Sequence, residues 1–132
     1  MKNRFKAIRE SRNLTPKEVG QKIGRTAAYV EGIETGKNKL TEGVYFKLSG
    51  TYDVMGDEVF NFKLDGINKA KCDDVLVDCC IWFLLDAAES RRVELSKKAL
   101  SKWTVFLNDA AISCHLDVHQ LRALAKLIVK KD

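Results

Sequence analysis

Apolar residues along most of the chain recur at spacings of three and four, which is the period of an α-helix with one buried face. No stretch alternates apolar and polar residues for long, as a half-buried β-strand would. The sequence therefore predicts an all-α protein. The expected buried faces in the first half of the chain are marked by Phe5 and Ile8, Val19 and Ile23, Val30 and Ile33, and Val44 and Leu48.

The most clearly marked helix start lies at Thr15. Thr15 stands at the N-cap, Pro16 at the first helical position and Glu18 at the third. This order predicts a capping box, in which the cap hydroxyl and the Glu carboxylate each accept a backbone N–H of the first turn. Gly24 is then expected in the left-handed conformation that ends a helix.

A second helix follows almost at once. Thr26 is expected to cap it, residues 27–35 to form it and Gly36 to end it. Two helices separated by a few residues, with a glycine in the turn, are the signature of a helix-turn-helix. Three further helices are expected in the same domain: one at residues 3–11, one capped by Thr41, and a short one from Asp57 to Phe60.

The second half of the chain predicts a separate, small helical module. We expect one domain at residues 1–65, a connector around Gly66 and the second module at 66–132. Its expected helices are 69–89, 93–108 and a final helix opened by the capping pair Asp117 and Gln120. The helix at 93–108 is expected to turn inward Leu95, Ala99, Leu100, Trp103, Phe106 and Leu107.

The expected helix at 69–89 is apolar nearly all round. From Val75 to Ala88 only Asp78 and Asp86 are charged. Such a helix must be covered on more than one side, either by a partner subunit or, as the central helix of a small bundle, by its own chain. Residues 66–132 are therefore expected to mediate formation of a homodimer or higher oligomer. The candidate aromatic anchors of that interface are Trp82, Phe83, Trp103 and Phe106.

The bulk composition is that of an ordinary globular protein, but the charge is unevenly placed. The chain has 132 residues, of which 45% are hydrophobic and 31% charged. Residues 1–39 hold ten Lys and Arg against four Glu, a net charge of +6, while the whole chain carries +5. A positive field concentrated at one end favours a polyanion such as double-stranded DNA as the partner.

Several classes of protein are disfavoured by the sequence. The charged N-terminus has no signal-peptide core, and the longest apolar run, Ile81–Leu85, is too short to span a bilayer. We therefore expect a cytoplasmic protein without a membrane partner. There is no Gly-rich phosphate loop and no nucleophile–base pair, and the chain has only 2 His. No enzymatic activity and no cofactor are expected.

The four cysteines fit no zinc-binding pattern. In the cytoplasm they are expected to be reduced. Cys79 and Cys80 lie on an apolar segment, where cysteine behaves as a small hydrophobic residue, and a redox switch is the alternative. Cys114, His115 and His119 offer too few ligands, at a spacing that straddles a helix start, so no metal site is expected.

Residues 4–62 resemble the Cro/repressor-type, Xre-like family of helix-turn-helix proteins. The segments that carry the resemblance are RxxRN followed by LTPKEVGQKIG, then TAAYVEGIETGKNK, and finally YDVMGDEVF. The resemblance implies a five-helix, DNA-binding domain. It also implies a partly buried ion pair between Arg9 and Glu34, which would orient the first helix against the third.

The resemblance further implies which residues approach DNA. The helix from Thr26 to Thr35 would enter the major groove by its N-terminal end, and the preceding helix would cross the DNA backbone. The implied base-proximal positions are Arg25, Thr26, Ala27, Ala28, Tyr29 and Gly32. The implied phosphate-proximal positions are Thr15, Lys17, Thr35, Lys37 and Lys39.

Two functional hypotheses remain open at this point. Alanine and glycine cannot make the bidentate contacts that distinguish bases. Either specificity would come from Arg25, Thr26, Tyr29 and DNA shape, or binding would be only loosely specific. The first hypothesis is a DNA-binding transcriptional regulator, a dimeric repressor. The alternative is an interaction protein that heterodimerises with a related repressor and binds DNA weakly or not at all.

Overall fold

The computed structural model describes residues 2–68 and 72–129, and the chain divides into two units, Met1–Asn61 and Phe62–Asp132. Every regular element among the described residues is a helix, and this part of the chain contains no β-strand. The expected all-α fold is therefore confirmed. The division falls after Asn61 rather than after Asp65, so that the buried Phe62 belongs to the second unit.

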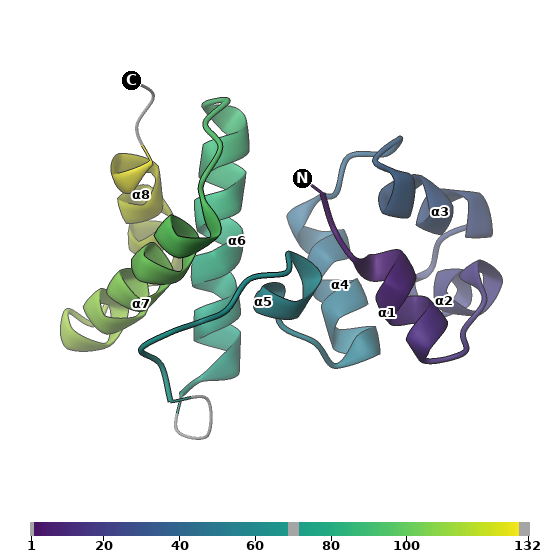
Figure 1. The fold of residues 1–132 in the computed structure, drawn as a ribbon, viewed down its shortest axis with the longest axis horizontal. Helices are drawn as coiled ribbons and strands as arrows, with labels where there is room; N and C mark the ends of the chain where they lie inside the picture. Colours follow the sequence, from purple (N-terminus) through teal and green to yellow (C-terminus); the bar gives the residue numbers. More distant parts are fainter. Residues whose placement is uncertain (1, 69–71, 130–132) are drawn as a thin grey trace. The chain divides into compact units, whose positions relative to one another are not determined.

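The first unit holds the expected helix-turn-helix and three further helices in its described residues. α1 begins at Phe5 rather than at the expected Asn3, because the Asn3 side chain accepts a hydrogen bond from the N–H of Phe5 at 3.1 Å and so precedes the first turn. The helices are α1 Phe5–Ser11, α2 Pro16–Ile23, α3 Ala27–Thr35, α4 Glu42–Tyr52 and α5 Gly56–Val59 (Figure 1).

Local hydrogen bonds begin α2 and α3 where the sequence predicts. Thr15 Oγ1 accepts from the N–H of Glu18 at 3.2 Å, and Glu18 Oε1 accepts from the N–H of Thr15 at 3.2 Å, which completes the capping box. The hydroxyl of Thr26 caps α3 by accepting a backbone N–H of the first turn. Both helices end at a glycine with left-handed backbone, with φ of 74° at Gly24 and 85° at Gly36.

An aromatic cluster joins α1 to α4 and to the end of α5. The Phe5 ring centroid lies 6.2 Å from that of Tyr45 and 6.0 Å from that of Tyr52. Tyr45 and Phe60 stack at 5.7 Å. Such rings bury large apolar areas and prefer these offset and tilted geometries. The remainder of this core comes mainly from Ile8, Val19, Ile23, Val30, Ile33, Val44 and Leu48.

The second unit consists, over its described residues, of three helices: α6 Asp74–Ser90, α7 Lys97–Ser113 and α8 Val118–Ile128. Each begins after a residue whose side chain accepts backbone N–H groups of the first turn, which is the ordinary role of an N-cap. The three caps are Asp73, Ser96 and Asp117, and Gln120 completes a capping box at the last.

The expected bounds of two helices in this unit are wrong. The helix expected at 69–89 begins at Asp74, because Asp73 caps it; residues 69–71 lie outside the described part of the chain. The helix expected at 93–108 begins after Ser96 and continues to Ser113. Arg92 adopts a left-handed φ of 55°, which turns the chain between the two helices and delays the second start.

The apolar helix α6 is the central helix of this unit, since both α7 and α8 pack against it. Among the described helices, none combines the length and the hydropathy that crossing a membrane requires. Burial raises the pKa of the Cys80 thiol to about 12, which suppresses its reactive thiolate form. The residues of α6 that are fully enclosed are Val77, Cys80, Ile81 and Leu84.

Trp82 and Phe83, two expected interface anchors, are buried. Trp82 is 2% exposed and Phe83 is 3% exposed, and the guanidinium of Arg122 on α8 lies 4.6 Å from the centroid of the Phe83 ring. These two side chains therefore offer almost no surface to a partner. The other two expected anchors, Trp103 and Phe106, are half-buried and 48% exposed respectively, so the prediction that both face inward on α7 is wrong.

Candidate nucleic-acid interface

The turn between α2 and α3 is closed by a contact that only glycine allows. The N–H of Arg25 donates to the carbonyl of Gly20 at 2.8 Å. A Cβ built on Gly20 would lie 2.5 Å from the carbonyl oxygen of Arg25, which is a backbone atom and cannot move aside cheaply. Gly20 thus lets the start of α3 pass close over α2 and sets the angle between the two helices.

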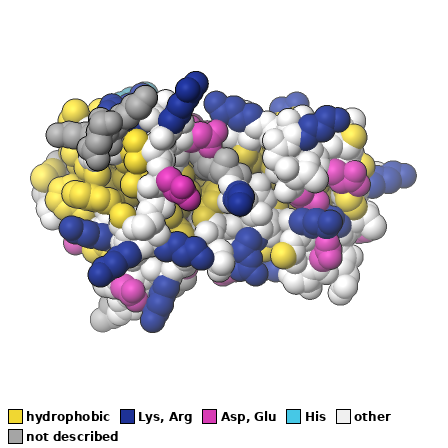
Figure 2. All heavy atoms as spheres, turned by 45° about the horizontal axis from the view of Figure 1, so that its top comes forward, with side chains coloured by type: hydrophobic (Ala, Val, Ile, Leu, Met, Phe, Trp, Pro, Cys, Tyr) yellow, Lys and Arg dark blue, Asp and Glu magenta, His cyan; other side chains and the backbone are white. Residues whose placement is uncertain are grey.

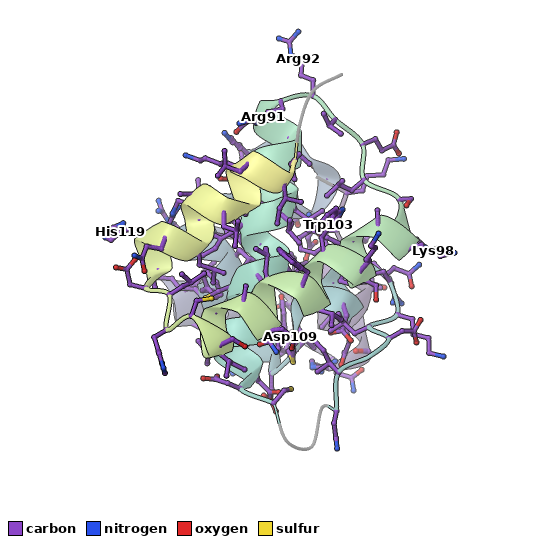
Figure 3. The ribbon with its side chains drawn as sticks, turned by 90° about the vertical axis from the view of Figure 1, so that its left-hand side faces the viewer. Arg91, Arg92, Lys98, Trp103, Asp109 and His119 are labelled. Carbon is purple, nitrogen blue, oxygen red and sulfur yellow. The ribbon has the colours of Figure 1, made fainter. Side chains whose placement is uncertain are left out.

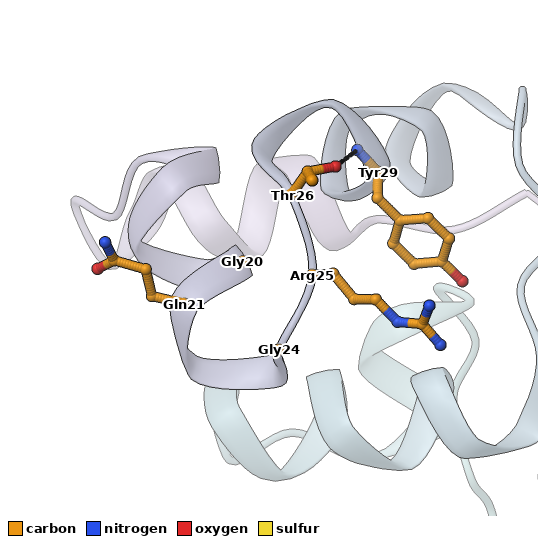
Figure 4. Close-up of a pocket in the computed structure, with 6 residues that line it drawn as sticks. All are labelled: Gly20, Gln21, Gly24, Arg25, Thr26 and Tyr29. Atoms are coloured by element: carbon orange, nitrogen blue, oxygen red, sulfur yellow. Dashed lines mark hydrogen bonds between the residues drawn. The ribbon is translucent and has the colours of Figure 1, made fainter.

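An open hollow of about 400 Å³ lies at this turn, lined by residues from both helices. Figure 4 shows the side chains of Arg25 and Tyr29 lying side by side along it. The guanidinium carbon of Arg25 is 4.8 Å from the centroid of the Tyr29 ring, a cation–π geometry. The ring therefore holds an exposed cation at the N-terminal end of α3. The lining residues are Gly20, Gln21, Gly24, Arg25, Thr26 and Tyr29.

The other expected base-proximal positions differ in what they offer. Thr26 and Ala28 are exposed and Ala27 is half-buried, so the first turn of α3 is accessible. The hydroxyl of Thr26 accepts the N–H of Tyr29 at 3.1 Å and is therefore engaged in capping. Arg25 is the one long side chain in this set, and Tyr29 is the ring beside it.

Gly32, expected among the base-proximal positions, is buried by the loop that follows α3. The side chain of Asn38 covers it so closely that a Cβ on Gly32 would collide with the Asn38 amide. The N–H of Asn38 donates to the carbonyl of Gly32 at 3.0 Å, and its Nδ2 donates to the carbonyl of Tyr29 at 3.4 Å. Gly32 therefore makes room for the loop and presents nothing to a ligand.

Asn38 is a positioning residue that was not predicted from the sequence. By bonding back to α3 it fixes the loop on which its two neighbours, Lys37 and Lys39, stand exposed. The signal for it in the sequence is weak: a short amide side chain two residues after the glycine that ends the helix. Asparagine in such a place commonly bonds to nearby backbone.

The five expected phosphate-proximal residues are all exposed, at the ends of helices or in the loop after α3. Two of the three that are lysines, Lys37 and Lys39, lie in that loop. The hydroxyl of Thr15 is engaged with Glu18 at 3.0 Å, and that of Thr35 donates to the carbonyl of Gly32 at 3.4 Å. Positive charge at this surface therefore comes from Lys17, Lys37, Lys39 and Arg25.

The ion pair expected between Arg9 and Glu34 is present and ties α1 to the end of α3. Arg9 Nε donates to Glu34 Oε2 at 2.7 Å and Arg9 Nη2 to Glu34 Oε1 at 3.1 Å, with side-chain exposures of 10% and 3%. Arg9 Nη1 also donates to the carbonyl of Leu14 at 2.9 Å. The hydrogen bonds to Glu34 raise the pKa of Arg9, so the buried cation stays charged.

Comparison with known proteins identifies the same segment. Residues 3–60 match a family model described as a helix-turn-helix domain. The matched residues contain all of α1 to α5 and lie within the first unit. No curated protein and no solved structure matches the chain.

Proposed function

Residues 3–60 form a helix-turn-helix domain, and from that premise we propose that this protein is a transcriptional repressor that binds duplex DNA as a dimer. Helix-turn-helix domains of this kind bind DNA by placing the second helix of the motif in the major groove. The observation that carries the proposal is the geometry of α2 and α3: two capped helices in a fixed turn, with exposed cations at both ends of α3.

In the proposed complex the N-terminal end of α3 enters the major groove. Arg25 then reaches a base edge from its position over the Tyr29 ring, where two of its N–H groups match the O6 and N7 acceptors of guanine. The exposed Ala28 packs on a thymine methyl group. With few base-reading side chains, sequence-dependent DNA shape supplies part of the specificity.

Phosphate contacts supply most of the affinity. Lys17 stands near the start of α2, and Lys37 and Lys39 stand in the loop after α3, so the proposed cations bracket the recognition helix. The net charge of residues 1–39, ten Lys and Arg against four Glu, adds attraction to the polyanion at longer range. Because a repressor must have access to DNA, the proposed location is the cytoplasm.

A single domain of this size covers little DNA and binds it weakly. Two copies related by a twofold axis would place their α3 helices about one DNA turn apart on a roughly palindromic site. The second unit is the part of the chain proposed to hold the copies together.

The test is selection of bound duplexes from a random pool, followed by a salt titration on the selected site. We expect two inverted half-sites about one helical turn apart, and a log–log salt slope of several units. Duplexes that are recovered without any common sequence would leave only non-specific binding. A salt slope near zero would contradict phosphate-driven docking of α3.

A second candidate function is an antagonist that pairs with a related repressor. It is favoured by one observation: of the six base-proximal positions, Ala27 and Ala28 have short apolar side chains and Gly32 is buried. An antagonist would select no duplex under the same conditions and would instead abolish DNA binding by the related repressor when the two proteins are mixed.

A further inference from the structure

α7 carries an aromatic pair on a side that is partly open to solvent. It buries three polar residues, Ser101, Thr104 and Asn108, together with its leucines, and it leaves Trp103 half-buried and Phe106 48% exposed. A helix that serves only its own bundle normally buries its aromatic residues and exposes its polar ones. Figure 2 shows hydrophobic side chains gathered over the surface of this unit, at the left of the view. An exposed apolar stripe of this kind marks an interaction surface.

A partly exposed side of α7 follows a heptad pattern. Its residues are separated by four, three, four and three positions, the spacing of the core of a coiled coil. Trp103 and Phe106 at its centre form an edge-to-face pair with ring centroids 5.6 Å apart and an interplanar angle of 89°. We call this set the α7 seam: Ala99, Trp103, Phe106, Ala110 and Ser113.

One flank of the α7 seam carries charges of opposite sign. Lys102 and Asp109 are both exposed and stand seven residues apart, two helical turns or about 10.5 Å along the axis. Figure 3 shows where Trp103, in the seam, and Asp109, on this flank, project from α7. The other flank consists of Leu100 and Leu107, which are buried. Only the charged flank is therefore open to a partner helix.

We propose that the α7 seam is the surface through which two copies of this chain pair, with their α7 helices antiparallel about a twofold axis. This proposal rests on the proposed function in one respect: the dimer formed through the α7 seam is taken to be the species that binds DNA. The twofold brings Trp103 against the partner's Phe106 and Ala99 against the partner's Ala110. Two central aromatic layers are then flanked by alanine layers, which allow the helices to approach closely.

Charge complementarity identifies the occupant as a second copy. In an antiparallel pair the same flank of both helices lies on one side of the interface. Lys102 then lies about 3 Å along the axis from the partner's Asp109, within reach of its long side chain, and the twofold repeats the pair. A parallel arrangement would place Lys102 opposite the buried leucine flank and leave both charges unmatched. The stripe is small, so we expect a dimer with a dissociation constant on the order of micromolar.

The test is a charge swap followed by sedimentation velocity on the full chain without DNA. Lys102→Glu alone, or Asp109→Lys alone, puts like charges across both symmetric pairs and should raise the dimer dissociation constant about tenfold. The double variant Lys102→Glu with Asp109→Lys should restore it to within about twofold of wild type, because opposite charges meet again. Within one chain, positions 102 and 109 are too far apart to form an ion pair. A rescue by the double variant would therefore come from pairs between two copies.

Two controls keep the result interpretable. Lys97→Glu changes an exposed charge at the start of α7, on the side away from the charged flank, and should leave the dissociation constant unchanged. Phe106→Ala truncates an exposed ring, so the fold should persist by circular dichroism while self-association is lost. Single swaps without effect, a double swap that fails to rescue, or a wild-type chain that stays monomeric would overturn the proposal.

The outcome separates this proposal from DNA binding. Monomeric variants that still bind a single half-site would leave the DNA-binding proposal standing, whatever happens to the seam. A swap-and-rescue pattern in a protein that selects no DNA would support the seam and refute the repressor.

Discussion

At the scale of single residues, two glycines decide the geometry of the candidate interface. Gly20 admits the backbone of Arg25 at a distance no side chain would allow, and Gly32 admits the Asn38 side chain. Neither has the left-handed backbone found at Gly24 and Gly36. Both positions require glycine because other atoms pack closely against the Cα, and not because the backbone has a positive φ. Which atoms pack there depends on residues elsewhere in the chain.

Gly20→Ala should therefore destabilise the protein, by about 2 kcal/mol, because the new methyl group forces α3 away from α2. Urea unfolding followed by circular dichroism measures the change in the free energy of unfolding. The matched control is Gly50→Ala in α4, where a Cβ meets nothing within 4 Å. Because alanine is the better helix former, the control should gain about 0.5–1 kcal/mol. Equal effects at the two sites would contradict the steric argument.

Tyr52 should lower the free energy of unfolding as the pH becomes alkaline. Burial raises the pKa of its hydroxyl to about 12, and among the described residues that oxygen has no hydrogen-bond partner. The unfolded tyrosine ionises near pH 10. The folded state therefore keeps a proton that the unfolded state loses, and this residue's contribution to stability falls as pH rises from about 10 to about 12.

Tyr52→Phe should remove that part of the alkaline destabilisation, because phenylalanine fills the site without an ionisable group. Melting temperatures of the two proteins should be close at pH 7 and should diverge above pH 10, with the variant the more stable. Parallel alkaline curves for variant and wild type would show that Tyr52 does not ionise on unfolding.

At the scale of elements, the ends of α3 are fixed from outside the helix. Arg9 on α1 holds Glu34 near its C-terminal end, Asn3 Nδ2 donates to the carbonyl of Ile33 at 3.1 Å, and Asn38 bonds back to Tyr29 and Gly32. A nine-residue helix is too short to be stable alone, so its position depends on these contacts and on its buried side. A fixed recognition helix loses little freedom on binding.

Removing one partner of the Arg9–Glu34 pair should be costly. Arg9→Met or Glu34→Met leaves an unpaired buried charge and should cost about 3–5 kcal/mol, measured by urea unfolding. The double variant should cost clearly less than the sum of the two single variants, because no charge remains to be buried alone. Strict additivity would mean that the two charges do not act together.

At the scale of the whole molecule, the two units have different surfaces. The first concentrates exposed cations around α3, and the second exposes the aromatic residues of α7. The proposed function assigns DNA binding to the first and self-association to the second. DNA binding by the first unit depends on salt concentration, whereas self-association through the second depends on protein concentration. The two proposals can therefore be tested in separate experiments.

Lys37→Ala with Lys39→Ala should weaken DNA binding on every sequence and reduce the salt slope by about 0.9 for each phosphate that is no longer neutralised. Fluorescence anisotropy at several salt concentrations measures both quantities. Lys47→Ala on α4 is the matched control, because it removes one exposed cation that the proposal leaves off the interface. A double variant with unchanged slope and affinity would contradict the docking of α3.

Local chemistry in the sequence determined where α2 and α3 begin and end. Thr15 with Glu18 and Thr26 act within their own first turns, and Gly24 and Gly36 end their helices through their own backbones. Such interactions need no tertiary structure to be recognised. The Arg9–Glu34 pair was inferred from resemblance to a family, because residues so far apart in sequence carry no local signal.

Only the tertiary structure decided which surfaces remain open. The spacing of apolar residues along α7 predicts one apolar face. It cannot show that Leu100 and Leu107 are buried in the bundle while Phe106 remains exposed. In the same way, nothing within α3 reveals that Asn38 covers Gly32. Burial is a property of neighbours, which the fold supplies. The helix-turn-helix was therefore readable from residues 14–36, whereas the usable part of its surface, and the α7 seam, appeared only when the helices were packed.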